Sequence, residues 1–164
     1  MQNKETKKTE SARRQQGPLV YIVSSIVIVL LLISGFVLFQ KKLSTVTYKT
    51  VTIGNEKFNL EVADTDAKRA KGLSERDSIP QYGGMFFDYK SEGDWRMWMV
   101  QMRFPIDIAW LKKDGTIVYI KHSAQPGDYP EIYHANQNSY YTIEVPAGTF
   151  DRLNVKEGAV IRIN

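Results

Sequence analysis

The chain has 164 residues, no cysteine and a formal net charge of +4. Without cysteine it cannot form a disulfide, a thiol nucleophile, a zinc–thiolate site or an iron–sulfur cluster. The first 18 residues carry most of the positive excess, whereas the part from Gln40 onward has 17 basic and 16 acidic residues. This balance argues against a nucleic-acid partner, which would normally face a basic surface.

Residues Leu19 to Phe39 form an apolar segment of 21 residues without a charge. At about 1.5 Å per residue such a helix spans roughly 30 Å, the thickness of a bilayer's hydrocarbon core, so the segment predicts a transmembrane helix. A cleaved signal peptide has a shorter apolar core and a small-residue cleavage site. A core helix of one small domain is not apolar on every face. We therefore expect an uncleaved signal anchor, with the lipid bilayer as its partner.

The charges beside this segment predict its orientation. Five Lys or Arg residues precede it, and three follow within a comparable distance. The positive-inside tendency then places the N-terminus in the cytoplasm and the C-terminal domain outside the cell. The expected protein is a single-pass protein of the cell membrane. Its expected parts are a disordered basic tail (1–18), the helix (19–39), a short linker and first strand (40–56) and a β domain (57–164).

Short β-rich runs separated by turns follow the apolar segment. A Thr at position 65 before Asp66 to Lys71, and Gly72 after it, predict a capped short helix. The Asp114-Gly115 pair predicts a hairpin between Pro105 to Leu111 and Thr116 to His122. The other expected strands are Thr45 to Ile53, Lys57 to Ala63, Met85 to Asp88, Tyr140 to Val145 and Ala159 to Ile163, with a helical turn near Thr149 to Leu153. This pattern is typical of a mainly β sandwich or barrel with one or two short helices.

Four separated motifs occur in order: ADTDAKRAKGLSERDSIP, GGMFFDY, WMVQMRFPIDIAWLKKDGTIVYI and TIEVPAG. Together they resemble the DUF192 (UPF0127) family of small prokaryotic domains, over about Phe58 to Asn164. The resemblance implies a jelly-roll-like β fold and frequent export or membrane anchoring. It implies no reaction, because the family is named for lacking an assigned function. The chain departs from the family pattern at Gln101 and Met102, where the family has Asn and Thr.

Asp107 is a carboxylate in a strand that is apolar on both faces. Phe104, Ile106, Ile108 and Trp110 share the opposite face. An unpaired buried charge is costly, so Asp107 needs partners, and Arg76, Arg96 and Arg103 are candidates. Backbone N–H groups are the alternative. We expect Arg76 and Asp107 to act as one unit, either as a structural ion pair or as a ligand site.

The domain is rich in Trp and Tyr outside its expected strands. Such residues offer stacking faces with a polar handle, as a site for a sugar or another polar small molecule would use, or they close the ends of a barrel. The candidate ligand-binding residues are Arg76, Trp98, Gln101, Asp107, Tyr129, Tyr133 and Glu144.

The sequence favours non-catalytic binding of a small polar ligand or envelope component, with no cofactor and no metal. Three alternatives remain open. Asp107 and Glu144 would serve a carboxylate-dependent hydrolase if they met across a cleft. A flat apolar patch would indicate a protein-interaction module. The thioethers of Met97, Met99 and Met102, joined by His122 or His134, would suit Cu(I).

Overall fold

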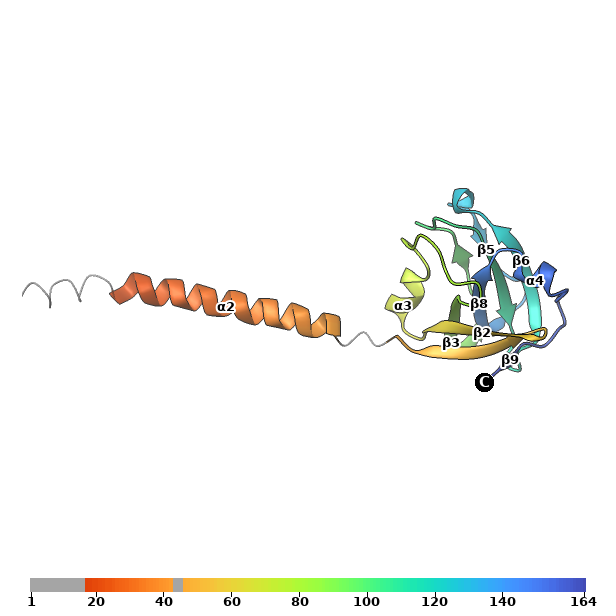
Figure 1. Cartoon of the computed structure of the whole chain (residues 1–164), viewed down its shortest axis with the longest axis horizontal. Helices are drawn as coiled ribbons and strands as arrows, with labels where there is room; N and C mark the ends of the chain where they lie inside the picture. Colours follow the sequence, from red (N-terminus) through yellow and green to blue (C-terminus); the bar gives the residue numbers. More distant parts are fainter. Residues whose placement is uncertain (1–16, 43–45) are drawn as a thin grey trace, which may run out of the picture. The chain divides into compact units, whose positions relative to one another are not determined.

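A computed structural model describes residues 17–42 and 46–164 of the chain. The described residues fall into two units, a helix before residue 46 and a β-rich domain from Val46 to Asn164 (Figure 1). Most of the expected basic tail and the linker at 43–45 lie outside the described residues, so the predictions made for them stay predictions.

The first unit is the helix α2 (Gly17–Lys42), which has 26 residues. It contains the expected helix (19–39) and continues beyond it at both ends. Side chains of α2 are described for residues 21–36. Within the described part of the chain, no helix is long and apolar enough to cross a membrane.

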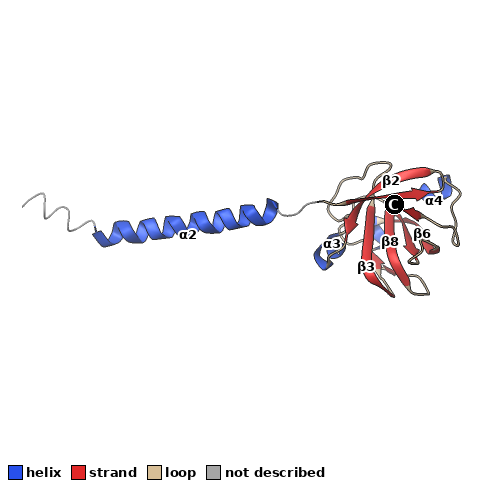
Figure 2. Ribbon diagram, turned by 90° about the horizontal axis from the view of Figure 1, so that it is seen from below, coloured by secondary structure: helices blue, strands red, loops and turns tan. Residues whose placement is uncertain are grey.

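The second unit is mainly β (Figure 2). Seven strands form one sheet in the order β6-β5-β8-β3-β2-β1-β9, and two more form a separate pair, β4 with β7. The strands of the main sheet are β1 (Tyr48–Ile53), β2 (Glu56–Ala63), β3 (Met85–Gly93), β5 (Ile106–Leu111), β6 (Ile117–Ala124), β8 (Ser139–Pro146) and β9 (Arg162–Ile163). The pair comprises β4 (Met97–Trp98) and β7 (Ile132–Tyr133), and the helical pieces are α3 (Asp66–Lys71), η1 (Pro126–Asp128) and α4 (Thr149–Arg152).

The seven-stranded sheet curls into a half-barrel. β9 pairs with β1 at one edge, and just before β9 the residue Val160 forms an antiparallel bridge with Thr116 beside the opposite edge strand, β6. The C-terminal segment therefore contacts both edges of the sheet. Of the two expected architectures, the barrel is therefore closer to the observed fold than the sandwich. β2 and β3 are parallel, with α3 in the connection between them, and the other strand pairs are antiparallel.

The predicted β5–β6 hairpin and the predicted helix are confirmed. Gly115 adopts φ of +87°, and a Cβ there would lie 2.2 Å from the carbonyl oxygen of Ile161. Only glycine fits both the turn and this close approach of the C-terminal segment. The helix α3 begins and ends at the predicted residues, with the Thr65 side chain accepting from the N–H of Lys68.

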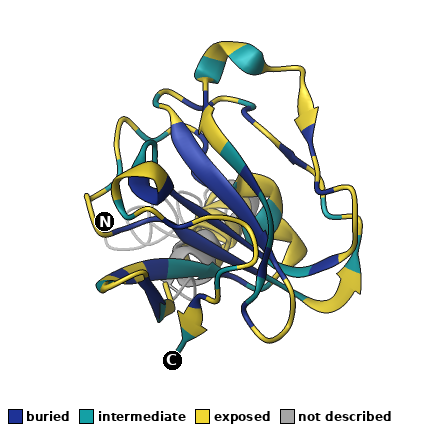
Figure 3. Cartoon of the chain, turned by 90° about the vertical axis from the view of Figure 1, so that its right-hand side faces the viewer, coloured by how far each residue is buried: buried dark blue, intermediate teal, exposed yellow. Residues whose placement is uncertain are grey.

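The sheet buries a separate apolar cluster on each face, because successive side chains of a strand alternate between faces. One cluster includes Phe58, Phe86, Ile143 and Phe150. The other includes Phe87, Ile108, Trp110 and residues from the β4–β7 region. The central strands are therefore buried over much of their length (Figure 3). The second cluster is the one that borders the candidate site.

Candidate functional site

A cavity of about 290 Å³ opens where α3 and the segment before β4 cover one face of the sheet. Its lining comes from three parts of the chain: α3 and the three residues after it, β3, and residues 95–98. Met102 and the β8 residue Glu144 complete the lining. The cavity thus joins segments far apart in the sequence.

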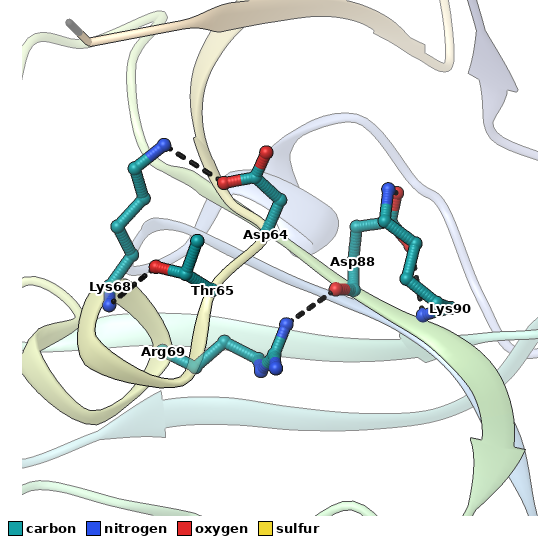
Figure 4. Close-up of polar contacts among 6 residues, drawn as sticks. All are labelled: Asp64, Thr65, Lys68, Arg69, Asp88 and Lys90. Atoms are coloured by element: carbon teal, nitrogen blue, oxygen red, sulfur yellow. Dashed lines mark hydrogen bonds and ion pairs between the residues drawn. The ribbon is translucent and has the colours of Figure 1, made fainter.

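The helix α3 is held in place by polar contacts at its start and along its side (Figure 4). The hydroxyl of Thr65 caps it, and the ammonium group of Lys68 lies 2.8 Å from the carboxylate of Asp64. Arg69 donates from its guanidinium group to the backbone carbonyl of Asp88 on β3, at 2.8 Å. This last bond ties the helix to the strand that forms the neighbouring wall, so the cavity has two fixed sides.

Aromatic side chains form one wall. The rings of Tyr89 and Trp95 stack with centroids 4.0 Å apart and an angle of 4° between their planes. Phe87 lies next along β3, with its ring centroid 6.4 Å from that of Tyr89. The indole N–H of Trp110 donates to the carbonyl of Trp95 at 2.7 Å, which fixes the segment that carries the stacked ring. The wall is therefore rigid and apolar.

Two polar side chains of β8 lie beneath this wall. Register pairs Thr142 with Phe87 and Glu144 with Met85, so both face the same side of the sheet as the wall. Thr142 is fully buried and Glu144 is 4% exposed. Among the described residues, Oε2 of Glu144 has no hydrogen-bond partner, whereas the Thr142 hydroxyl lies near that of Tyr89. Buried polar groups in native proteins are nearly always paired, so this arrangement is exceptional.

Burial raises the pKa of Glu144 from its ordinary value of 4.5 to about 8, and the positive charge of Arg76 acts in the opposite direction. Glu144 is therefore mostly a neutral carboxylic acid at pH 7, with one O–H donor. Burial also raises the pKa of Tyr89 to about 12, although the nearby Thr142 hydroxyl lowers it. The Tyr89 hydroxyl donates to the sulfur of Met97 at 3.3 Å. The floor of the cavity at Glu144 is thus polar but mostly uncharged at pH 7.

The charged residues that line the cavity are mostly basic. Arg69, Lys71 and Arg96 lie there, against the carboxylate of Asp66 and the neutral Glu144. Arg69 contacts Asp66 and its guanidinium carbon lies 5.6 Å from the Tyr89 ring centroid. The side chain of Arg96 is 58% exposed and uses its Nε for a carboxylate outside the cavity.

A second cavity, of about 480 Å³, adjoins the first. Ala70 and Trp98 line both. Tyr129 and Ile132 line the second cavity and are about half exposed, as is Trp98. Two of the sequence-predicted aromatic residues, Trp98 and Tyr129, therefore meet here.

The predicted unit of Arg76 and Asp107 is wrong. Arg76 donates both terminal nitrogens to the carboxylate of Glu61 on β2. Asp107 accepts from the backbone N–H of Ser123 at 2.8 Å and from that of Phe150 at 3.1 Å. The backbone alternative for Asp107 is thus the one found. Its carboxylate joins β6 and the start of α4 to β5.

Asp107 and Glu144 do not face each other. Asp107 pairs in register with Val145, and Glu144 is the next residue of β8, so the two carboxylates point to opposite faces of the sheet. The carboxylate pair of the hydrolase alternative is therefore wrong. Neighbouring residues of a strand point to opposite faces of the sheet. A single sequence does not show which residue of β5 lies opposite which residue of β8, so it could not tell that these two carboxylates face apart.

The remaining candidates are placed apart from the first cavity. Gln101 is exposed, has φ of +54°, and accepts from the N–H of Glu75 through its backbone carbonyl. Tyr133 is 4% exposed, and its hydroxyl donates to Asp128. Burial and that carboxylate raise the pKa of Tyr133. These contacts give both residues a part in loop structure.

The three methionines of the copper alternative lie in one buried cluster. Met97 and Met102 line the first cavity, but neither histidine does. His122 pairs with Asp151 and His134 pairs with Asp94. Over the described residues, no group of three or more His, Asp or Glu side chains could hold a metal ion.

Sequence reasoning missed Phe87, Tyr89 and Thr142. The expected strand ended at Asp88, whereas β3 continues to Gly93. Period-two alternation over the longer strand would have put Phe87 and Tyr89 on one face, as it puts Thr142 beside Glu144. The alternation was therefore present in the sequence, but the predicted strand ended before Tyr89.

Comparison with known proteins gives a family but no activity. No curated protein matches the chain. A crystal structure from Sinorhizobium meliloti 1021, described as a candidate transcription regulator, is 27% identical with a TM-score of 0.68, and the match covers 73% of this chain and 95% of that one. A protein of unknown function from Novosphingobium aromaticivorans is 28% identical with a TM-score of 0.64, and the match covers 71% and 84%.

Residues 49–163 match the model of the DUF192 family, which is described as an uncharacterized ACR. This match covers most of the chain and includes every motif on which the resemblance was based. The chain belongs to the DUF192 family.

Proposed function

We propose that this protein is a membrane-anchored domain that binds a small polar ligand, without catalysis, in the cavity above Glu144. The observation that carries the proposal is the buried, unpartnered Oε2 of Glu144, a residue that lines the cavity. Leaving a buried polar group unpaired costs about 1–3 kcal/mol. A ligand that supplies the missing hydrogen bonds would offset this cost on binding.

The chemistry of the floor suggests how the ligand is held. Because the pKa of Glu144 is raised to about 8, its carboxyl group is a hydrogen-bond donor at neutral pH. It can donate to a hydroxyl or carbonyl oxygen of the ligand. The stacked rings of Tyr89 and Trp95 offer an apolar wall for the rest of the molecule.

A ligand screen with matched variants tests the binding proposal. The full chain, in micelles of a polyoxyethylene detergent, is screened against polar metabolites by thermal shift. For each hit, affinities are compared for wild type, Glu144→Met, Glu144→Gln and the exposed control Glu92→Gln. Methionine matches the length of glutamate without its hydrogen bonds, whereas glutamine keeps an N–H donor.

We expect Glu144→Met to weaken binding at least tenfold, and Glu144→Gln and Glu92→Gln to bind nearly as wild type at pH 7. Hits that bind Glu144→Met as tightly as wild type would place the ligand elsewhere and overturn the proposal. Loss of binding in Glu144→Gln alone would contradict the neutral-acid role.

The anchor is the second part of the proposal: the apolar segment Leu19 to Phe39 holds the chain in the cell membrane. This part rests on the full sequence of the segment, which is longer than the stretch 21–36 whose side chains the structure describes. The 21 uncharged residues from Leu19 to Phe39 support it, as do the large apolar side chains of α2, which are 49% to 74% exposed. The hydroxyls of Ser24 and Ser25 donate to the carbonyl of Tyr21 within the helix. Such internal bonds satisfy polar side chains in lipid.

The lysine and arginine count favours an N-terminus in the cytoplasm and a β domain outside the cell. Single cysteines placed by Ser11→Cys and Lys113→Cys, in a chain that has no other cysteine, test this on intact cells with a membrane-impermeant thiol reagent. We expect labelling at position 113 and protection at position 11. The opposite pattern would reverse the orientation, and a chain that leaves the membrane fraction in high salt would refute the anchor.

A further inference from the structure

We propose that the two adjoining cavities form one groove for an anionic oligosaccharide, a chain of several sugar rings that carries acidic groups. The proposal rests on the proposed function, since it uses the Glu144 cavity as one end of the groove. It adds the size and the chemical class of the ligand.

The proposed groove rests on the residues that the two cavities share. Ala70 and Trp98 line both the cavity above Glu144 and the cavity beside Tyr129, so the two cavities lie next to each other. The volumes of about 290 and 480 Å³ together lie within the range of about 300–1,000 Å³ typical of ligand sites. A single sugar ring would fill only part of this combined volume, so a ligand that contacts both cavities has several rings.

The surfaces of the groove suit sugar rings. A sugar presents C–H groups on its faces and hydroxyls around its edge, and it stacks on aromatic rings through those faces. The exposed rings of Trp98 and Tyr129 offer such faces, at 44% and 54% exposure. At the closed end, Glu144 lines the first cavity, and its neutral carboxyl group can donate to a ligand hydroxyl.

The charged side chains of the groove indicate the sign of the ligand's charge. Arg69, Lys71 and Arg96 line the first cavity, and Asp66 is its one acidic side chain besides the neutral Glu144. Arg69 is paired with Asp66 and Lys71 with Glu75. Arg96 has the most spare capacity, because its contact with Asp94 uses only Nε and, among the described residues, its terminal nitrogens make no hydrogen bond. A guanidinium group with free terminal nitrogens matches a carboxylate in two parallel hydrogen bonds. This complementarity selects an acidic oligosaccharide over a neutral one.

The test compares ligands that differ in length, charge and chemistry. Galacturonate oligomers of one to four residues, neutral malto-oligosaccharides of the same lengths and an oligoglutamate of three residues are titrated calorimetrically into the full chain in polyoxyethylene micelles. The variants are Trp98→Ala and Arg96→Gln. Their controls are Tyr48→Ala and Arg162→Gln, which change exposed residues outside both cavities.

We expect the galacturonate trimer to bind at least tenfold more tightly than the monomer and than maltotriose. Trp98→Ala should reduce the affinity for the trimer to that for the monomer, because the second cavity then lacks its shared wall. Arg96→Gln should remove the preference for the acidic trimer over maltotriose. The two control variants should bind as wild type does, and all variants should keep a cooperative thermal transition.

Three outcomes would overturn the proposal. Equal affinity for monomer and trimer would refute the continuous groove, and equal affinity for maltotriose would refute the acidic class. Oligoglutamate that binds as tightly as the galacturonate trimer would show that charge alone is recognised. If no galacturonate binds but the metabolite screen yields a ligand lost in Glu144→Met, this inference fails while the proposed function stands. If neither set yields a ligand, both fail.

Discussion

Replacing Glu144 by glutamine should remove a pH dependence from the stability of the domain. The pKa of Glu144 is about 8 in the folded state, against an ordinary value of 4.5. Between these values the folded state keeps a proton that the unfolded chain has lost. The free energy of unfolding therefore falls as pH rises, by about 1.4 kcal/mol per pH unit.

The size of the effect follows from the shift. A difference of roughly 3.5 pH units corresponds to about 5 kcal/mol over the full range, of which about 3 kcal/mol is lost by pH 7. This contribution to stability is fully present below pH 4.5 and is lost once the pH passes about 8. Glutamine has the same shape and does not titrate, so Glu144→Gln should lack this slope.

Urea unfolding measures this pH dependence of stability. All three tryptophans lie in the β domain, so their fluorescence follows that domain in the full chain. Unfolding free energies are determined for wild type and Glu144→Gln at pH 5, 6, 7, 8 and 9. Their difference cancels the titration of the other groups. We expect the free energy of unfolding of Glu144→Gln, relative to that of wild type, to rise by about 1.4 kcal/mol per pH unit up to pH 8 and to stay constant above it. A difference that stays constant from pH 5 to 8 would refute the buried, unpaired state of Glu144.

Three further changes probe the fold around the site. Asp107→Ala should lower the free energy of unfolding by about 3 kcal/mol, because two backbone N–H groups lose their acceptor; an unchanged urea midpoint would contradict this. Gly84→Ala should cost about 3 kcal/mol by thermal unfolding, since φ is +148° and the added Cβ would lie 2.0 Å from a β8 carbonyl oxygen, whereas Gly127→Ala has open space and should be nearly neutral. A double-mutant cycle on Arg76 and Glu61 should give a coupling of only about 0.5–1 kcal/mol, because the two side chains are 35% and 22% exposed; a coupling above about 3 kcal/mol would indicate a buried pair instead.

Local sequence signals predicted most of the secondary structure. The helix α3 has its predicted bounds because Thr65 and Gly72 act within one turn of it. The β5–β6 hairpin follows from its own Asp-Gly turn. The pair β4 and β7 was missed because each strand has two residues, too few to show a period.

The sequence by itself determined the apolar segment, the single mainly β domain and the family, since each depends on composition, on local pattern or on motif order. It also singled out Glu144, Trp98 and Asp107 as candidate ligand-binding residues. Only the tertiary structure decided their partners. Asp107 bonds to backbone N–H groups 16 and 43 residues away, and Glu144 lies under a helix that belongs to another part of the chain. The face to which a strand residue points depends on the register with its neighbours, and register is a property of the assembled sheet.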